Sequence, residues 1–287
     1  MKYIDLHVHS NASDGTFSPE DLTEEAWKQN LAAFALTDHD TIQGVKRAVK
    51  HSEEMSKNGK NIEVIPGVEL SLEYKKRDIH MLGFMIDYEN AAFAKALDDA
   101  QAERSTRNEK MVKNLSNAGI DITMEELLTL SGDAVITRAH FGKLLLEKKY
   151  VKTLSEAFEK YLGEDGPYYV PRKYISPEDG IDLIRSVGGI PVLAHPMVYQ
   201  LPEEELDALI HRLKNHGLMG IETIYSSNTE SDEDMIRRYA DKYDLIMTGG
   251  SDFHGTNKPL IHLGTGKGNL KIPYSILETL KEAKQNL

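Results

Sequence analysis

The sequence predicts an α/β fold built as one barrel with a helical insertion. Short apolar segments alternate with helical segments over residues 1–87 and again after residue 170, an alternation typical of a parallel α/β sheet or barrel. Between them, residues 88–170 carry helical patterns without a convincing strand, and a crossover connection needs far fewer residues. We therefore expect a barrel formed by residues 1–87 and 171–287, capped by an insertion segment, residues 88–170.

The first strand carries two histidines on one face. Apolar residues at positions 4, 6 and 8 alternate with Asp5, His7 and His9, and side chains two positions apart in a strand point to the same side. Two such imidazoles either bind a metal ion or pair with other buried polar groups, since an unpaired buried polar group costs about 1 to 3 kcal/mol. These residues alone leave both interpretations open.

The remaining barrel elements follow from start and stop signals. The runs 18–21 and 176–179, both Ser-Pro-Glu-Asp, combine a capping serine, a first-turn proline and acidic residues that favour the positive end of a helix. We expect further strands at 31–36, 62–65, 79–86, 190–194, 220–224 and 245–248. We expect helices at 18–30, 41–57, 176–188, 202–216, 232–243 and 274–285, and in the insertion segment at 91–118, 123–130, 138–148 and 154–161.

Composition excludes several classes of protein. The formal net charge is −12 and no long lysine-rich or arginine-rich run occurs, so the chain lacks the footprint of a protein that grips long duplex nucleic acid. A small anionic substrate remains compatible if metals and a few arginines reverse the local field. The absence of cysteine leaves imidazole and carboxylate as metal ligands, which favours manganese, iron, zinc or magnesium.

No membrane partner is expected. The N-terminus lacks a basic and apolar leader, and no apolar run approaches the roughly 20 residues of a membrane span. We therefore expect a cytoplasmic protein.

Chemically useful side chains recur where predicted strands end, which is the rim from which α/β barrels draw catalytic residues. The residues at the C-terminal end of a predicted strand are His7, His9, His39, Glu69, His195, Asp252 and His254. By contrast, His51, His211 and His216 fall on predicted helix surfaces, and His262 is expected to be structural.

These residues belong to motifs that resemble, in the same order, those of the polymerase and histidinol phosphatase (PHP) family. The motifs are Asp5-Leu6-His7-Val8-His9-Ser10 with Ser13-Asp14-Gly15, Thr37-Asp38-His39-Asp40, Gly67-Val68-Glu69, Ala194-His195-Pro196 and Ser251-Asp252-Phe253-His254. The insertion segment resembles that of stand-alone phosphoesterases acting on nucleotides and RNA ends, on the evidence of Ile136-Thr137-Arg138 with His140 and of Tyr169-Val170-Pro171-Arg172. Ala139 departs from the proline common at that place.

The resemblance implies a distorted barrel of seven strands that holds two to three divalent metals, most naturally manganese. It assigns His7, His9, Glu69 and Asp252 to a first metal, Glu69, His80 and His195 to a second, and Asp14, His39 and His254 to a third. His80 fits least well, because it lies near the start of its predicted strand. Asp38, Asp40 and Glu222 are placed where they could orient ligands, although Glu222 could equally cap a helix.

The expected chemistry is hydrolysis of a phosphoester by a hydroxide that bridges two cations. Two cations about 3.5 to 4 Å apart can clamp both oxygens of an in-line displacement and activate water. The catalytic candidates are Asp252, His195 and His254, and either histidine or a metal-bound water could protonate the leaving group. The sequence does not choose between them.

Substrate binding is assigned to cationic residues of the insertion segment and its exit. Arg138, His140, Arg172 and Lys173 are the candidates for contact with phosphate. Arg104 and Arg107 lie among acidic residues and are expected on a solvated helix face. Tyr168 and Tyr169 are expected to anchor the insertion segment, with base stacking as the alternative.

The leading hypothesis is therefore a metal-dependent phosphatase of a nucleoside monophosphate or a 3',5'-bisphosphate. A 5'-3' exoribonuclease on short RNA ends is the main alternative, followed by a histidinol-phosphate phosphatase. A metal amidohydrolase is disfavoured because Glu69 takes the place of its usual bridging carboxylated lysine. A non-catalytic metal-binding module is disfavoured because the ligand set is complete.

Overall fold

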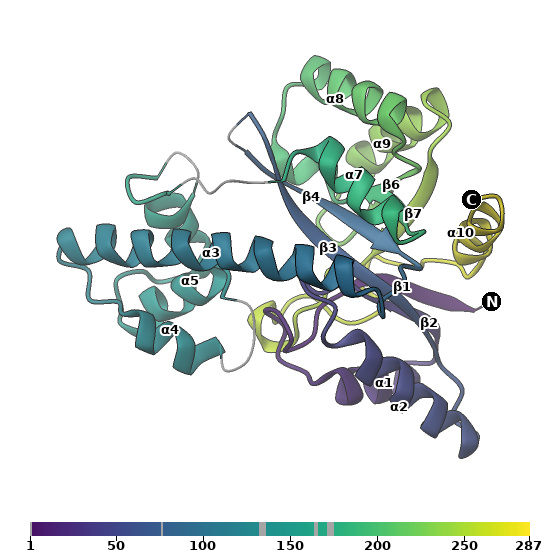
Figure 1. Cartoon of the computed structure of the whole chain (residues 1–287), viewed down its shortest axis with the longest axis horizontal. Coiled ribbons are helices and arrows are strands. Elements are labelled where there is room, and N and C mark those ends of the chain that lie inside the picture. Colours follow the sequence, from purple (N-terminus) through teal and green to yellow (C-terminus); the bar gives the residue numbers. More distant parts are fainter. Residues whose placement is uncertain (1, 76, 132–135, 164–165, 171–174) are drawn as a thin grey trace.

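The computed structural model describes residues 2–75, 77–131, 136–163, 166–170 and 175–287. Within these residues, seven strands form one sheet in chain order, and the sheet nearly closes into the predicted distorted barrel (Figure 1). The strands are β1 (Tyr3–Val8), β2 (Leu31–Leu36), β3 (Glu63–Tyr74), β4 (Arg77–Phe84), β5 (Ile190–Leu193), β6 (Gly220–Tyr225) and β7 (Ile246–Gly250).

The segment after β7 meets β1 across the opening of the sheet. The Asp252 amide donates to the His7 carbonyl over 2.8 Å, and the His9 amide donates to the Phe253 carbonyl over 3.0 Å. A Cβ at Gly250 would lie 2.1 Å from the Cβ of His7, so a glycine is required for this close approach. The first and last motifs of the chain are thereby brought side by side.

One strand runs against the others. β4 is antiparallel to both β3 and β5, whereas the other neighbouring pairs are parallel. The expectation of a strand ending at residue 65 was wrong, because β3 continues to Tyr74 and pairs with β4 up to Arg77. β2 pairs with β3 only as far as Pro66, so the far part of β3 and β4 forms a ribbon beyond the parallel strands. Glu69 therefore lies within β3 rather than after it.

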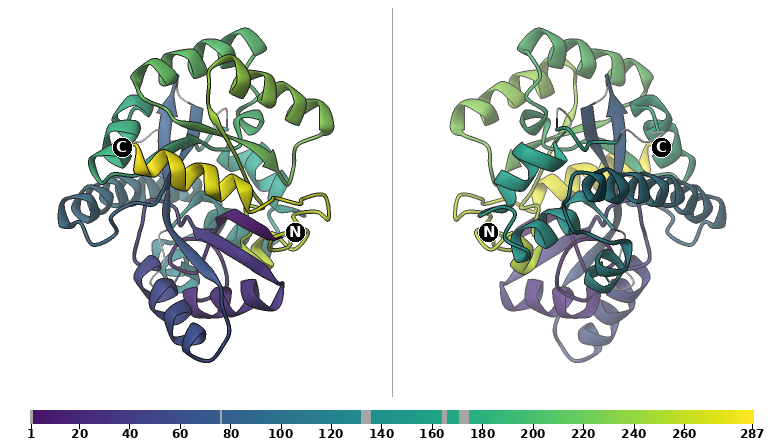
Figure 2. Two further views of the ribbon diagram at one scale, coloured as in Figure 1. Left: turned by 90° about the vertical axis from the view of Figure 1, so that its right-hand side faces the viewer. Right: turned by 90° about the vertical axis from the view of Figure 1, so that its left-hand side faces the viewer.

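Helices surround the barrel in the views of Figures 1 and 2. They are α1 (Pro19–Lys28), α2 (Val45–Lys57), α7 (Pro177–Ser186), α8 (Glu203–His216), α9 (Glu230–Lys242) and α10 (Ser275–Gln285). The predicted capping serines are confirmed, since Ser18 and Ser176 each accept a hydrogen bond from a backbone amide of the first turn. α2 begins later than predicted, because Thr41 Oγ1 accepts from the Gln43 amide in a local turn that competes with the helix.

The insertion segment is helical and lies to one side of the barrel in Figure 1. It contains α3 (Ala91–Asn117), α4 (Met124–Ser131), α5 (Arg138–Glu147), α6 (Leu154–Ala157) and the π-helix η1 (Phe158–Leu162). The predicted helix at 154–161 is thus split in two. These helices share a hydrophobic cluster of their own that includes Met111, Phe141 and Leu145, while the start of α3 packs through Phe93 on the core beside β3. α3 therefore joins two hydrophobic cores.

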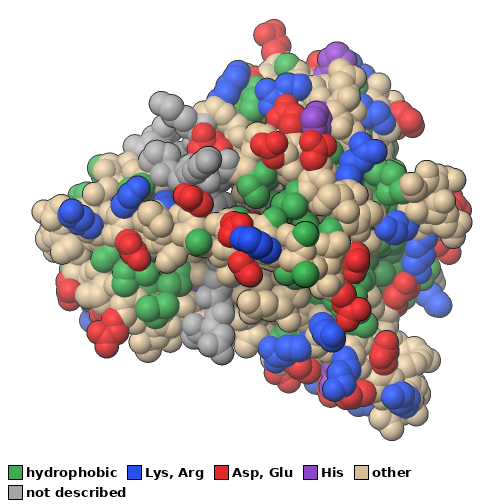
Figure 3. All heavy atoms as spheres, in the orientation of Figure 1, with side chains coloured by type: hydrophobic (Ala, Val, Ile, Leu, Met, Phe, Trp, Pro, Cys, Tyr) green, Lys and Arg blue, Asp and Glu red, His purple; other side chains and the backbone are tan. Residues whose placement is uncertain are grey.

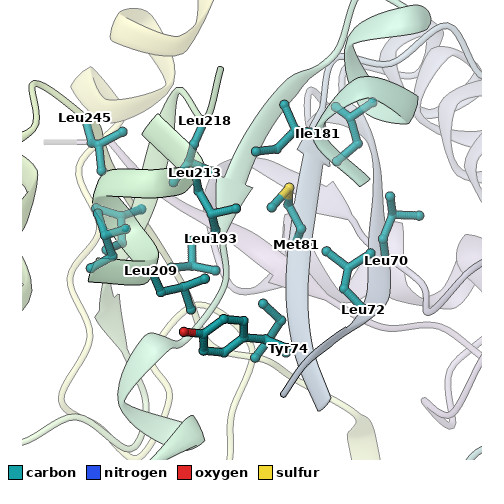
Figure 4. Close-up of a cluster of buried hydrophobic side chains, with 14 of the residues drawn as sticks. Leu70, Leu72, Tyr74, Met81, Ile181, Leu193, Leu209, Leu213, Leu218 and Leu245 are labelled. Carbon is teal, nitrogen blue, oxygen red and sulfur yellow. The ribbon is translucent and has the colours of Figure 1, made fainter. Parts of the chain in front are cut away.

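The core beside β3 and β4 explains which way Glu69 points. Leu70 and Leu72 of β3 and Met81 of β4 pack against helices that include α7 and α8 (Figure 4). Alternate residues of a strand face opposite sides, so Glu69 and Ser71 point away from this core. Apolar periodicity thus turns the Glu69 carboxylate toward the other side of β3.

The surface in Figure 3 carries acidic and basic side chains interspersed, without a continuous basic stretch on that face. Among the described residues, no helix has both the length and the apolar character needed to cross a membrane.

Candidate metal centre

The predicted ligands gather at the rim where the parallel strands end. His7 lies on β1 and His9 directly after it, His39 follows β2, and His195 follows β5. Asp252 and His254 follow β7, and Glu69 pairs with His39 in a parallel bridge between β3 and the end of β2. The rings are packed close together, with centroids 4.1 Å apart for His9 and His254 and 5.2 Å apart for His7 and His9. The structure thus brings all seven strand-end residues of the sequence prediction into one cluster.

The direction of β4 places His80 in the same cluster. Because β4 is antiparallel, its beginning lies at the rim where the parallel strands end, and His80 pairs with Ser71 in the β3 ribbon. His80 Nδ1 lies 2.8 Å from Glu69 Oε1, and the rings of His80 and His195 are 5.1 Å apart. The position near a strand start, which made His80 the weakest candidate, is therefore the position that reaches the site.

The Glu69 carboxylate lies among five rings. Its Oε1 is 2.8 Å from His80 Nδ1 and 3.0 Å from His195 Nε2. Its Oε2 lies within 3.3 Å of three more ring nitrogens, those of His7 (Nε2), His9 (Nε2) and His39 (Nδ1). A carboxylate with a set of nitrogens around each oxygen is suited to bridging two cations.

Several polar atoms of the cluster are buried without a hydrogen-bond partner among the described residues. They are His7 Nε2, both ring nitrogens of His9, His39 Nδ1, His80 Nδ1, His195 Nδ1 and Glu69 Oε2. Each such atom costs about 1 to 3 kcal/mol if nothing satisfies it, and one cation would satisfy several at once. Ligand atoms within 4.8 Å of one another form three groups, which are His9, Asp14, His39 and His254; His7, His9 and Glu69; and His39, Glu69 and His80. Imidazole and carboxylate in these groups fit divalent cations.

The charges of the cluster favour ligation. Burial by itself raises the pKa of Glu69, but the His39 and His80 rings outweigh burial and hold that pKa well below its ordinary value. The pKa values of Asp14 and Asp252 are also well below theirs, since neighbouring cationic groups again outweigh burial. The carboxylates are thus ionised, as metal ligation requires.

The pKa of His9 is shifted upward. Burial by itself lowers it, but Asp252 and Glu69 outweigh burial and raise that pKa to about 9. A protonated imidazole cannot ligate, so metal binding at His9 must release a proton.

Two carboxylates predicted as orienting groups hold ligand residues in place. Glu222 Oε1 lies 3.0 Å from His7 Nδ1, and Glu222 Oε2 accepts from the His195 amide over 2.8 Å. Asp38 accepts from the amide and hydroxyl of Ser10 and from the hydroxyl of Ser13, over 2.7 to 2.8 Å. Glu222 therefore orients two histidines rather than capping a helix, and Asp38 fixes the loop between His9 and Asp14.

Asp5 is a buried group that sequence reasoning missed. Its carboxylate accepts from the Ser251 amide and hydroxyl over 2.8 and 2.5 Å, and from the Gly264 amide over 2.7 Å. It thereby ties β1 to the loops after β7, and burial raises its pKa despite these hydrogen bonds. The signal was present, since Asp5 shares a strand face with His7 and His9.

The expectation that Arg104 and Arg107 lie on a solvated helix face was wrong. Arg104 is only 7% exposed and Arg107 only 2%. The Arg104 guanidinium pairs with the Asp40 carboxylate and donates to Ser71 Oγ over 2.7 Å. The acidic neighbours of Arg104 in sequence occupy other faces of α3, so the helix turns Arg104 toward the barrel.

The start of α5 lies against the same cluster. Thr137 Oγ1 donates to Asp14 Oδ2 over 3.2 Å, and His140 Nδ1 accepts from the Thr137 amide over 3.0 Å. The Arg138 guanidinium pairs with Asp78 and donates to the Leu162 carbonyl over 3.1 Å. Of the four predicted phosphate contacts, Arg138 and His140 thus lie at this contact between insertion segment and barrel, and Arg172 and Lys173 lie outside the described residues.

Lys258 is a second group that sequence reasoning missed. Its ammonium donates to Asp252 Oδ2 over 2.6 Å, and the Tyr225 hydroxyl donates to the same oxygen over 2.7 Å. The only signal in the sequence is its place in the loop that follows His254.

Comparison with known proteins identifies the family of this chain. The family described as "PHP domain" matches residues 5–170, which is more than half of the chain. This chain belongs to the PHP family. A 5'-3' exoribonuclease Rnm of Salmonella typhimurium is 33% identical over 91% of this PHP chain and 87% of its own length. A 3',5'-nucleoside bisphosphate phosphatase of Chromobacterium violaceum is 32% identical over 88% of each protein.

A solved structure confirms the fold of this PHP chain. It is that of a Chromobacterium violaceum protein named an amidohydrolase, with bound sulfate and no metal, and it matches with a TM-score of 0.87 and 30% identity over 98% of this chain and 96% of that one. Together with the curated relatives, the family confirms that this chain is a metal-dependent hydrolase of phosphoester bonds.

Proposed function

We propose that this PHP chain releases phosphate from a small nucleotide, a nucleoside monophosphate or a 3',5'-bisphosphate, and that two or three divalent cations bind at the Glu69 cluster. The single observation that carries the proposal is the convergence of unsatisfied ring nitrogens on the two oxygens of Glu69. Cations bound there would polarise the phosphoryl group and lower the pKa of water. The relative named a bisphosphate phosphatase supports this choice of substrate.

The ligand sets predicted from the sequence stay our proposal for the cations. His7, His9, Glu69 and Asp252 would hold one, Glu69, His80 and His195 a second, and Asp14, His39 and His254 a third. The third set lies within one of the groups whose ligand atoms approach within 4.8 Å. Mixed imidazole and carboxylate donors suit manganese, with iron, zinc or magnesium as the alternatives.

The protein's own residues would position the proton that the leaving group needs. His195 is held by Glu222 at its backbone amide, and His254 Nδ1 lies 2.8 Å from the Asp252 carbonyl. His254 Nε2 lies 3.2 Å from Asp14. Both rings are therefore fixed at the cluster, and both stay candidates for the proton donor, with Asp252 as the carboxylate between His254 and His9.

The insertion segment is proposed as a cap on the open end of the barrel. The contact of Thr137 with Asp14 supports this, because it joins α5 to a candidate ligand. Arg138 and His140, with Arg172 and Lys173, stay proposed phosphate contacts. The cytoplasm stays the predicted location, which cell fractionation would check.

A 5'-3' exoribonuclease is the second candidate, favoured by the relative named 5'-3' exoribonuclease Rnm. Such an enzyme would admit only the terminal nucleotides of an RNA to this site, which the acidic chain permits. The two candidates differ in the released product, which is inorganic phosphate in one case and mononucleotides in the other.

The decisive experiment is a product analysis with manganese-loaded enzyme. The substrates are nucleoside monophosphates, adenosine 3',5'-bisphosphate, short 5'-phosphorylated RNAs, histidinol phosphate and amides. We expect phosphate release from the nucleotides, abolished by chelation and restored by manganese. Mononucleotides released from RNA without phosphate release from nucleotides would establish the second candidate. Activity confined to amides would refute both.

A further inference from the structure

Lys258 lies one carboxylate away from the converging rings. Asp252 Oδ2 accepts from Lys258 Nζ over 2.6 Å. The other oxygen, Asp252 Oδ1, lies 3.3 Å from His9 Nε2 and 3.4 Å from His254 Nδ1. The ammonium is therefore at the edge of the candidate metal centre, on the far side of one of its proposed ligands.

The loop that carries Lys258 is held rigidly against the cluster. The Lys258 amide donates to the Gly255 carbonyl over 3.2 Å, and the Lys258 carbonyl accepts from the Ile261 amide over 2.9 Å. Asn257 Nδ2 donates to the Asp14 carbonyl over 2.8 Å. With its backbone fixed on both sides and its loop tied to Asp14, Lys258 is positioned before any ligand arrives.

The side chain of Lys258 is more exposed to solvent than those of the two arginines described at the cluster. The side chain of Lys258 is 41% exposed, whereas those of Arg104 and Arg138 are 8% and 15% exposed. Arg104 is enclosed between Asp40 and Ser71, so an incoming anion cannot reach it without displacing them. An ammonium has three N–H donors, and the bond to Asp252 uses one of them. Lys258 therefore combines a fixed position with access from solvent.

The negative charge of the chain and of the cluster also favours a role for Lys258 in binding phosphate. The chain has a net charge of −12, and Asp14, Glu69 and Asp252 are all ionised at the cluster, so a phosphate group needs fixed positive charge close by.

We infer that Lys258 binds a phosphoryl oxygen of the substrate as well as holding Asp252. The inference rests on the proposed function, since it takes the substrate to be a phosphate ester. The alternative is that Lys258 acts only through Asp252, as a group that positions a ligand.

The test compares Lys258→Gln with Lys258→Arg in manganese-loaded enzyme. Lys267→Gln is the matched control, because Lys267 is a lysine in the same C-terminal region whose ammonium donates to Ser227 Oγ over 3.1 Å. Three quantities are measured: manganese content, the dissociation constant of inorganic phosphate by calorimetry, and kcat and KM for adenosine 3',5'-bisphosphate.

We expect Lys258→Gln to retain its manganese and to bind inorganic phosphate about 10- to 100-fold more weakly, as the loss of a charged hydrogen bond predicts. KM should rise in parallel, Lys258→Arg should recover most of the phosphate affinity, and Lys267→Gln should match the wild type. Lys258→Met, which keeps an aliphatic stem, repeats the measurement if Lys258→Gln does not fold.

An unchanged phosphate affinity in Lys258→Gln would overturn the inference. A loss of manganese from this variant that accounts for its whole loss of phosphate affinity would also overturn it. Phosphate binding needs no turnover, so the two proposals fail separately. If the wild type hydrolyses no nucleotide and yet needs Lys258 to bind phosphate, the proposed function fails and the inference stands. If the wild type hydrolyses nucleotides and Lys258→Gln binds phosphate normally, the proposed function stands and the inference about Lys258 fails.

Discussion

Two buried carboxylates flank His39, and they are held by different regions of the molecule. Asp38 is held by the barrel, through Ser10 and Ser13 in the loop that follows β1. Asp40 bonds to β3 and is also held by the insertion segment, through Arg104 of α3 and through Gln101, which donates to the Asp40 carbonyl over 2.9 Å. One candidate ligand is therefore fixed from the barrel on one side and from the insertion segment on the other.

The difference shows that the insertion segment is part of the scaffold of the site. Asp40 has a φ of 50°, a conformation that non-glycine residues rarely adopt and that surrounding contacts must maintain. Its amide donates to the Glu69 carbonyl over 2.9 Å, and its Oδ1 accepts from the Ser71 amide over 2.8 Å. Arg104 thus acts on a residue that is bonded to the Glu69 backbone.

The largest effect is expected from removing a proposed metal ligand. His9→Ala and Asp252→Asn should fold but lose nearly all phosphate release, because each removes a proposed ligand from the cluster. Activity and manganese content are measured together, with His216→Ala as the control, since His216 pairs with Asp182 on the surface. Wild-type turnover in either ligand variant, with its metal content restored, would refute the assignment.

Arg104→Met tests the side of His39 held by the insertion segment. It leaves the Asp40 carboxylate buried beside an apolar side chain, so we expect a loss of about 3 kcal/mol in the free energy of unfolding, measured by urea denaturation. The double variant Arg104→Met/Asp40→Asn should recover part of this loss. Lys95→Gln, an exposed residue of the same helix that pairs with Asp99, is the control. A loss no larger than that of the control would show that the ion pair does not hold the helix to the barrel.

Asp38→Asn tests the side held by the barrel. An amide oxygen can replace only part of the acceptor capacity that Ser10 and Ser13 use, so the loop carrying Asp14 should loosen. We expect manganese affinity or activity to fall about 10- to 100-fold. Metal titration of the purified variant measures the affinity, and phosphate release measures the activity. A wild-type affinity for manganese in Asp38→Asn would show that Asp38 does not hold the loop that carries Asp14.

Thr137→Val should have the smallest effect. It removes the hydrogen bond that Thr137 donates to Asp14 over 3.2 Å and keeps the shape of the side chain. A change of about 1 kcal/mol or less in stability is expected, together with a modest rise in KM if α5 helps to close the site. A loss of activity as large as that of His9→Ala would mean that Thr137 takes a direct part in catalysis.

Much of the barrel and of the candidate site could be predicted because its signals are local. The alternation around His7 and His9 placed both rings on one face, and capping serines marked the starts of α1 and α7. Strand ends meet at one rim in an α/β barrel, so the order of the motifs was enough to gather His39, His195 and His254 with them.

Other features depended on pairings between distant segments, which no local pattern encodes. The antiparallel direction of β4 decided that His80 reaches the cluster and that Glu69 lies within a strand. Packing of α3 on the barrel decided that Arg104 is buried against Asp40.

The amino-acid sequence by itself thus determined the class of fold, the chemistry of the candidate ligands and the strand ends near which most of them lie. Only the tertiary structure showed that Asp5 ties β1 to the loops after β7 and that Lys258 pairs with Asp252. The physical reason is that periodicity and capping act within a few residues, whereas a buried charge finds its partner across the fold.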